Sequence, residues 1–132
     1  MNRILRTIAF LFAASLYSAA ASAQSTSSHA GDEDQTFFDF QVDHAVKIRV
    51  NRAPAYPENL RSAHIEGQVL VQFVVDERGT ADMNTFKVVK TTSPEFAEAV
   101  RRAISNTSYS PAEIRGRAVK QLVQQPFIFN AR

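Results

Sequence analysis

The stretch that most constrains this fold is residues 67–89, where two runs of alternating apolar residues are joined by a short polar turn. In the first run every second residue is large and apolar: Val69, Val71, Phe73 and Val75. This period-2 alternation is typical of a β-strand with one face in a core. The run stops at residues 76–79, whose last residue, Gly79, can take the positive φ angle that a short hairpin loop needs. We therefore predict a β-hairpin, with a return strand from about Ala81 to Lys90.

The hairpin needs a third strand and a cover, because an isolated hairpin is only marginally stable in water. Its return strand changes phase between Met83 and Phe86, which indicates a β-bulge. A third strand is predicted from about Ala118 to Phe129, where apolar residues again alternate. Pro126 lies within this strand and favours an edge position, because proline has no N–H to donate to a neighbouring strand.

Two helices are predicted to supply the cover. A short helix from about Pro57 to His64 begins with a proline, which suits the first helical turn. A longer helix begins after Ser93, and its apolar residues recur at the spacing of one helical face: Phe96, Ala99, Val100, Ala103 and Ile104. We expect Phe96 to face Phe73 between this helix and the sheet. The predicted fold class is α+β: an antiparallel sheet of three strands, or four, with both helices packed on one face.

The first part of the chain has the features of a targeting segment. Arg3 and Arg6 precede an apolar core at residues 8–16, and residues 21–23 form a small-x-small cleavage site. Residues 1–23 are therefore predicted to be a secretory signal peptide. The alternative is an uncleaved membrane anchor, but the apolar stretch is shorter than the ~20 residues that a spanning helix needs.

The rest of the chain divides into three segments. Residues 24–36 are rich in serine, glycine and acidic residues and are predicted to be a disordered acidic linker. In residues 37–52 apolar and polar residues alternate, which predicts one or two extra strands. Residues 53–132 are predicted to form the globular domain.

The charge of the chain argues against one class of partner. The full sequence has 15 basic and 13 acidic residues, but without the two arginines of the predicted signal peptide it is balanced at 13 of each. This balance gives no support for a nucleic-acid partner. The charge is nevertheless uneven, since residues 24–43 hold five acidic residues and no basic one, whereas residues 44–132 hold 13 basic and 8 acidic residues. We therefore predict an acidic arm that leads into a basic domain.

The sequence contains no pattern typical of an enzyme. Cysteine is absent, which excludes disulfides, thiol catalysis and zinc-thiolate sites. The three histidines, at positions 29, 44 and 64, lack metal-ligand spacing, and no serine lies in a G-x-S-x-G elbow. Tyr56 and Tyr109 can be interpreted as a ligand-stacking pair, but closure of the core at the helix ends is the simpler interpretation. We predict no enzymatic activity, no metal and no cofactor.

Several short motifs occur in a specific order along the domain. They are Tyr56-Pro57, the run from His64 to Asp76, Gly79, the Phe96 helix, Tyr109-Ser110-Pro111-Ala112, and Gly116 with Val119. Together they resemble the C-terminal domain of the TonB family, over about Pro54 to Phe129. The resemblance implies a periplasmic domain of two helices and three strands. In that family the domain adds the extended "box" peptide of outer-membrane receptors to its sheet edge, and so couples proton motive force to uptake.

The sequence departs from the full transducer of that family toward its N-terminus. The family's anchor helix carries a serine and a histidine that engage the proton-driven motor, whereas the first histidine here is His29. The family's long proline-rich spacer has no counterpart, since all five prolines lie at or after Pro54. A membrane contact is expected only if the leader is retained, which would make the protein an inner-membrane-anchored transducer that faces the periplasm.

The resemblance implies a periplasmic peptide-binding module that contacts an outer-membrane receptor or another envelope partner by strand addition, in support of transmembrane transport. A second interpretation is a structural or assembly protein of the envelope, in which the same edge pairs with another copy as a homodimer. The expected contact residues lie on the last strand, and two charges that could steer a partner lie in the turn before it. They are Val119, Lys120, Gln121, Leu122, Val123 and Gln124, with Arg115 and Arg117 as the steering charges.

Two further expectations concern the edge of the sheet. A proline at an outward-bonding position near Gln121 or Val123 should abolish peptide binding and leave a folded domain. Part of residues 38–50 is expected to lie on a sheet edge of the resting protein and to compete with the incoming peptide. The alternative is that this segment is a permanent strand, integral to the fold.

Overall fold

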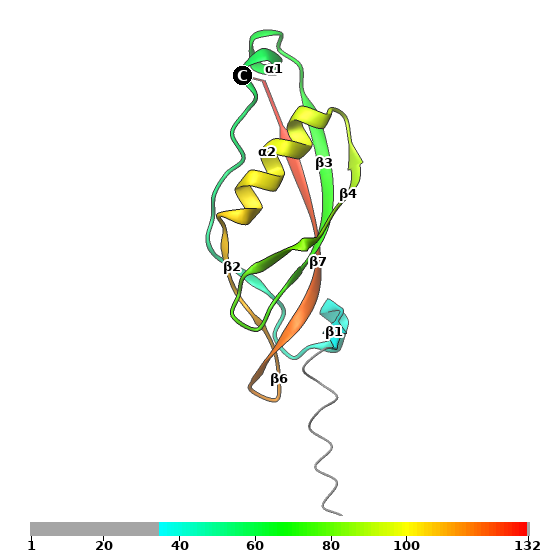
Figure 1. Ribbon diagram of the computed structural model, residues 1–132, viewed down its shortest axis with the longest axis vertical. Coiled ribbons are helices and arrows are strands. Elements are labelled where there is room, and N and C mark those ends of the chain that lie inside the picture. The colour runs from blue at the N-terminus through cyan, green and yellow to red at the C-terminus, as the bar shows by residue number, and fades with distance from the viewer. Residues whose placement is uncertain (1–34, 132) are drawn as a thin grey trace, which may run out of the picture.

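The computed structural model describes residues 35–131, in which a long helix crosses one face of a curled β-sheet (Figure 1). The predicted signal peptide, residues 1–23, and residues 24–34 of the predicted linker lie outside the described residues. Within residues 35–131, no helix has the length and apolar character needed to cross a membrane.

Ten elements follow one another along the chain, and the two α-helices fall close to the predicted ranges. They are β1 (Thr36–Phe37), η1 (Asp39–Gln41), β2 (Lys47–Val50), α1 (Glu58–Ser62), β3 (Gly67–Val75), β4 (Ala81–Thr91), α2 (Pro94–Ser105), β5 (Ser108–Ser110), β6 (Ala112–Ile114) and β7 (Arg117–Phe129). In the main sheet the strand order is β1-β7-β3-β4, β6 also pairs with β7, and β2 pairs with β5 in a separate two-stranded sheet. The predicted antiparallel sheet is confirmed as β7-β3-β4, and β1 adds a short parallel strand beside β7.

The predicted hairpin is formed by β3 and β4. Its turn is held by Asp76, whose N–H donates to the Thr80 carbonyl (2.9 Å) and whose carbonyl accepts from the Gly79 N–H (3.0 Å). Gly79 has the expected positive φ, 80°. The β3–β4 register shifts between Gln72↔Lys87 and Val74↔Asp82, where the change of phase predicts an irregularity, and it shifts a second time between Leu70 and Val71.

The core lies between α2 and the sheet. Four residues of α2 are buried, namely Phe96, Val100, Ala103 and Ile104, and all of them belong to the predicted face. Phe96 and Phe73 are both fully buried in one cluster, but their rings have different neighbours. The Phe96 ring stacks on Phe129 at 4.3 Å between centroids, whereas the Phe73 ring tilts against Tyr109 at 5.8 Å. The expected Phe73–Phe96 pairing is therefore replaced by two aromatic groups at different places in the same core.

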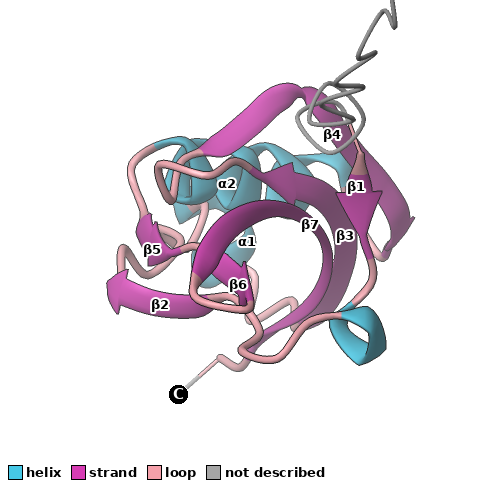
Figure 2. Cartoon of the chain, turned by 90° about the horizontal axis from the view of Figure 1, so that it is seen from below, coloured by secondary structure: helices cyan, strands magenta, loops and turns pink. Residues whose placement is uncertain are grey.

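The segment before α1 pairs with three different parts of the domain. Residues 36–37 lie beside β7, residues 43–44 bond to β6 through Glu113, and β2 pairs with β5. Seen along the long axis, β7 curls round (Figure 2), and β6 and β1 lie toward the lower end of the molecule in Figure 1. This arrangement leaves most of the length of β7 at the border of the sheet.

Candidate functional site

The outer side of β7 is one border of the main sheet, and β4 forms the other. On one side, residues 121–129 pair with β3 along the whole length of that strand, from Val75↔Gln121 to Gly67↔Phe129. On the other side, β1 pairs with only Lys120 and Gln121. Within residues 35–131, no strand pairs with residues 122–129 on the side away from β3. We call this unpaired side of residues 122–128 the open edge.

Pro126 determines which backbone groups of β7 face the open edge. Opposed residues of an antiparallel ladder alternate between pairs that exchange both N–H···O bonds and pairs that exchange neither. Pro126 lies opposite Leu70 and has no N–H, so this pair is of the second kind. Even-numbered residues such as Leu122 and Gln124 therefore direct their backbone N–H and C=O groups toward the open edge. Odd-numbered residues such as Val123 direct theirs toward β3.

A hollow lies at each end of the open edge. One, of about 350 Å³, is lined by Phe38 and Asp39 of the arm together with Gln72 and residues 121–124. The other, of about 330 Å³, is lined by residues 127–130 together with Ala53, Pro54 and Tyr56. A partner segment of six or seven residues in extended conformation, at about 3.3 Å per residue, would be long enough to reach from one end of the open edge to the other.

The structure separates the sequence-predicted contact residues into two groups. Val119 and Gln121 have buried side chains, and Val119 pairs with Ala112 of β6. Gln121 is the one buried polar residue among the described residues, and its Oε1 accepts the Val46 N–H at 2.9 Å. Leu122, Val123 and Gln124 lie on the open edge, although only the first and third face it with their backbone. The outward-bonding position for the test proline near Val123 is therefore Gln124, and not Val123 itself.

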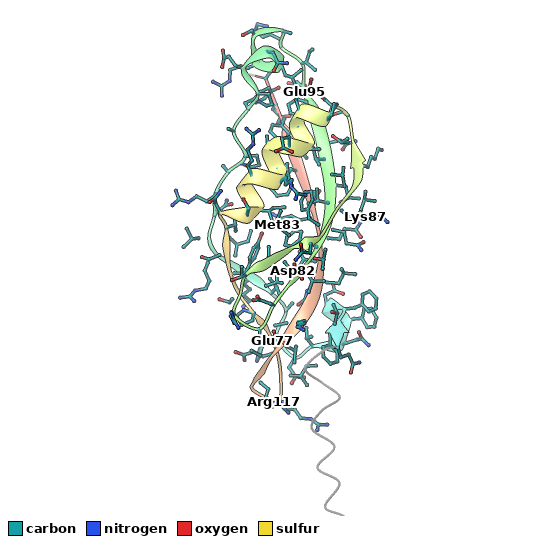
Figure 3. The ribbon with its side chains drawn as sticks, in the orientation of Figure 1. Glu77, Asp82, Met83, Lys87, Glu95 and Arg117 are labelled. Carbon is teal, nitrogen blue, oxygen red and sulfur yellow. The ribbon has the colours of Figure 1, made fainter. Side chains whose placement is uncertain are left out.

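The two predicted steering charges lie at the end of the molecule where β7 begins. Arg115 and Gly116 form the two-residue loop between β6 and β7, with φ angles of 51° and 76°. Such a pair of positive φ angles is typical of a type I′ hairpin turn. Arg117 is exposed and lies at the lower end of the molecule in Figure 3.

One exposed residue on the open edge, Ile128, was not among the predicted contact residues. Ile128 is 72% exposed, although it is a large aliphatic residue within a strand. It alternates in phase with Leu122 and Gln124, so its backbone also faces the open edge. The sequence does contain a signal for Ile128: residues 127–129 are apolar on both faces of the strand and follow Pro126, which is unusual for an edge strand exposed to solvent.

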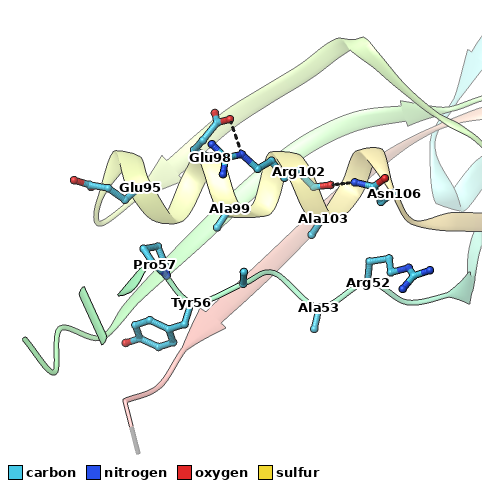
Figure 4. A pocket seen from close by; sticks show the side chains of 11 residues that line it. Arg52, Ala53, Tyr56, Pro57, Glu95, Glu98, Ala99, Arg102, Ala103 and Asn106 are labelled. Carbon is cyan, nitrogen blue, oxygen red and sulfur yellow. Dashed lines mark hydrogen bonds and ion pairs between the residues drawn. The ribbon is translucent and has the colours of Figure 1, made fainter. Parts of the chain in front are cut away.

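A further hollow, of about 700 Å³, lies between α2 and residues 52–57 (Figure 4). The charges on its α2 side are already engaged, since Glu98 pairs with Arg102 at 3.3 Å and the Glu95 carboxylate accepts from the Ser93 hydroxyl. Its lining contains no serine, histidine, aspartate or lysine, so it does not offer the nucleophile and base of an acyl-transfer site.

Tyr56, Tyr109 and the two described histidines have structural settings. Tyr56 packs edge-on against Phe96 and Phe129, and Tyr109 is buried in the same core. Burial raises the pKa of Tyr109 to about 12. His44 exchanges backbone hydrogen bonds with Glu113, and His64 follows α1 with a positive φ of 54°. Among residues 35–131 no three His, Cys, Asp or Glu side chains cluster as a metal site would require.

Comparison with known proteins shows which protein family this chain resembles in sequence and structure. The family model described as "Gram-negative bacterial TonB protein C-terminal" matches residues 52–131. The structure is similar to the solution structure of the Pseudomonas aeruginosa TonB C-terminal domain, with a TM-score of 0.59 and 26% identity over 68% of this chain and 90% of that one. It is also similar in fold to a TonB2 protein from Vibrio anguillarum, with a TM-score of 0.52 and 24% identity over 74% of this chain and 92% of that one. No curated protein matches the sequence. Because the family model covers more than half of the chain, this protein belongs to the family of TonB C-terminal domains.

Proposed function

We propose that this protein is a periplasmic adaptor that binds an extended segment of an outer-membrane receptor by adding it as a strand to the open edge. Domains of this family generally interact with outer-membrane receptors as protein partners. The backbone of the added strand supplies the affinity, and its alternate side chains supply the selectivity. In this role the domain binds a partner and performs no chemistry.

The single observation that carries the proposal is the unpaired side of residues 122–128. An edge of this length presents a row of backbone donors and acceptors at the spacing of an incoming strand. A strand added beside β7 would lie about 4.8 Å from it, with a hollow at each end of the edge for side chains. Ile128 adds an exposed apolar side chain to this surface.

The test is a proline at Gln124, because its backbone N–H faces the open edge. The probe is a synthetic ten-residue peptide with the box sequence of an outer-membrane receptor from the same genome, followed by isothermal titration. We expect Gln124→Pro to lower the affinity at least tenfold while the thermal unfolding midpoint changes little. Gln124→Ala is the matched control: it removes the same side chain, keeps the N–H, and should bind like the natural protein.

Two outcomes would reject strand addition at this edge. One is equal binding by Gln124→Pro and Gln124→Ala, because the bound peptide would then not depend on the backbone of β7. The other is a Gln124→Pro variant that loses self-association, measured by sedimentation, while its peptide binding is unchanged. That result would favour the assembly interpretation, in which the edge pairs with a second copy.

A further inference from the structure

The arm occupies the beginning of the edge that the proposed function needs. β1 pairs in parallel with β7, with Thr36 opposite Lys120 and Phe37 opposite Gln121. In a parallel pair, a residue that faces its neighbour bonds to the two residues that flank its register partner. Gln121 directs its backbone toward β3, so Phe37 faces Lys120 and Leu122 with its N–H and C=O. The Leu122 N–H, at the start of the open edge, is therefore already engaged by the arm, whereas the open edge beyond it has no strand partner among the described residues. Thr36 directs its own backbone groups away from β7.

This pairing stops because the arm turns away at Phe38. The Phe38 N–H donates to Gln41 Oε1 (2.9 Å), and the Gln41 N–H donates back to the Phe38 carbonyl (3.0 Å). The Phe40 N–H is satisfied locally by Asp39 Oδ1 at 2.8 Å. These local bonds form η1 and end the strand, because they hold Asp39, the next residue whose backbone would face β7, in a 3₁₀ turn. If the strand continued, Phe38 would lie opposite Leu122 on the open edge.

Residues 35–41, which we call the cover segment, add nothing to the core. None of them is buried, and the rings of Phe38 and Phe40 stack on each other while remaining 48% and 79% exposed. The residues that follow are attached much more firmly. Asp43 Oδ2 accepts the Arg115 N–H at 2.6 Å, Val46 donates to the buried Gln121, and β2 pairs with β5.

The cover segment therefore lies where an incoming strand must lie, but it can leave without opening the core. Phe38 and Asp39 line the same hollow as Leu122 and Gln124. A peptide backbone placed beside β7 at this point would take up the position of β1 and η1. The firmly attached residues 43–50 remain in place and keep the displaced segment close to the edge.

We infer that the cover segment is a built-in competitor: it occupies the N-terminal part of the open edge in the resting protein and is displaced by the partner peptide. This inference rests on the proposed function, because it concerns regulation of the same edge. Competition of this kind lowers the apparent affinity for the partner by the fraction of molecules in which the edge is free. A tenfold reduction corresponds to about 1.4 kcal/mol of docking.

The register supplies a matched set of variants of the full chain. Phe37→Pro removes the N–H that faces Lys120, whereas Thr36→Pro introduces the same residue at a position whose N–H faces solvent. Phe37→Ala removes the ring and keeps the N–H. Amide hydrogen exchange reports release of the cover segment directly. In Phe37→Pro the amides of Lys120 and Leu122 should lose protection, while those of Val123 and Gln125, which face β3, should keep it.

The binding probe is a synthetic peptide with the sequence of residues 33–42 of this chain, added to each variant and followed by NMR titration. A short tether gives a millimolar effective concentration, so a tenfold preference for the docked arm predicts a dissociation constant of roughly 0.1 mM for the released edge. We expect Phe37→Pro to bind this peptide about tenfold more tightly than Thr36→Pro and the natural protein. The receptor peptide should show the same tenfold ratio of affinities between Phe37→Pro and Thr36→Pro.

The remaining outcomes overturn the inference. Equal affinity of Phe37→Pro and Thr36→Pro, with Lys120 and Leu122 already released, would mean that the cover segment does not compete. An unfolded Phe37→Pro beside a folded Thr36→Pro would mean that β1 is integral to the fold. Failure of the receptor peptide with every variant, while the arm peptide behaves as expected, would reject the proposed partner and leave the built-in competitor standing.

Discussion

Gly79 and Gly116 both have positive φ angles, 80° and 76°, but their surroundings differ. A Cβ atom on Gly79 would lie 2.0 Å from the Tyr109 carbonyl oxygen, whereas a Cβ on Gly116 would meet no atom within 4 Å. The Tyr109 N–H also donates to the Gly79 carbonyl at 2.9 Å, so the turn and β5 are held together at this point. Gly79 is therefore required for close approach as well as for its φ angle.

We expect Gly116→Ala to lower the free energy of unfolding by about 1–2 kcal/mol, the cost of a left-handed conformation for an L-residue. Gly79→Ala should cost clearly more, because the backbone of Tyr109 has to move as well. Urea denaturation of the two variants measures the difference. Equal losses would show that the approach of Tyr109 to the turn contributes nothing.

Burial of Tyr109 makes stability depend on alkaline pH. Its pKa rises from 10.0 to about 12 in the folded protein, so the unfolded chain loses the phenolic proton first. The unfolded state then binds fewer protons than the native state, and the free energy of unfolding falls as pH rises. This contribution is complete below pH 10 and is lost between about pH 10 and pH 12. It amounts to on the order of 2–3 kcal/mol.

Tyr109→Phe removes the titrating group and should remove this part of the alkaline loss. Denaturation midpoints of the natural protein and the variant, taken at several values between pH 9 and 12, give the comparison. The natural protein should lose more stability than the variant over this range. Parallel curves would contradict the prediction.

At the scale of elements, α2 is the helix that closes the core. Phe96 is fully buried, and its ring contacts both Tyr56, from the segment before α1, and Phe129, at the end of β7. This one side chain therefore joins three parts of the chain that are distant in sequence. The Pro94 start and the exposed Glu98–Arg102 pair, in contrast, are local features of the helix.

Phe96→Ala should lower the free energy of unfolding by about 3–5 kcal/mol, because it leaves a cavity at this junction. Phe40→Ala is the control with the same chemical change, since Phe40 is 79% exposed. Its effect should stay within about 0.5 kcal/mol. Urea denaturation measures both effects. If Phe96→Ala lowers the free energy of unfolding by less than about 1 kcal/mol, the buried face of α2 is assigned wrongly.

At the scale of the whole molecule, positive charge lies near the beginning of the open edge. Residues 44–132 carry 13 basic and 8 acidic residues, and Arg117 lies exposed where β7 begins. Lys87 lies on β4, the strand at the opposite border of the sheet (Figure 3). The two positions therefore offer the same change of charge on opposite sides of the sheet.

We expect Arg117→Glu to slow association with an acidic-flanked receptor peptide several-fold at low salt, and this difference should shrink as salt screens the charges. Lys87→Glu changes the net charge equally and should have a smaller effect, because it lies away from the open edge. Stopped-flow association rates over a range of salt concentrations provide the test. Equal effects of both variants would mean that only net charge matters.

Local sequence patterns predicted the elements whose partners are close in the chain. The alternation of Val69 to Val75 with the Asp76–Gly79 turn predicted the hairpin, and the helical spacing of Phe96, Val100 and Ile104 predicted the buried face of α2. The family resemblance followed from the order of such local motifs. In each case the pattern depends on a repeat of two or 3.6 residues, which a sequence displays directly.

The alternation of residues 37–50 predicted strand structure, but it did not reveal which partners the segment would have. The tertiary structure divides the segment into β1 beside β7, η1, and β2 beside β5. It also buries Gln121, because the N–H of Val46, 75 residues away, needs an acceptor. Local patterns cannot predict such pairings, since alternation fixes which side chains share a face but not which strand lies alongside.

The sequence by itself determined that β7 would be an edge strand, because Pro126 cannot donate to a second neighbour. Only the tertiary structure decided which backbone groups remain unpaired. The register with β3 directs Leu122 and Gln124 toward the open edge, and the parallel register with β1 directs Phe37 toward its beginning. A shift of register by one residue would reverse every one of these directions while leaving the local pattern of the sequence unchanged.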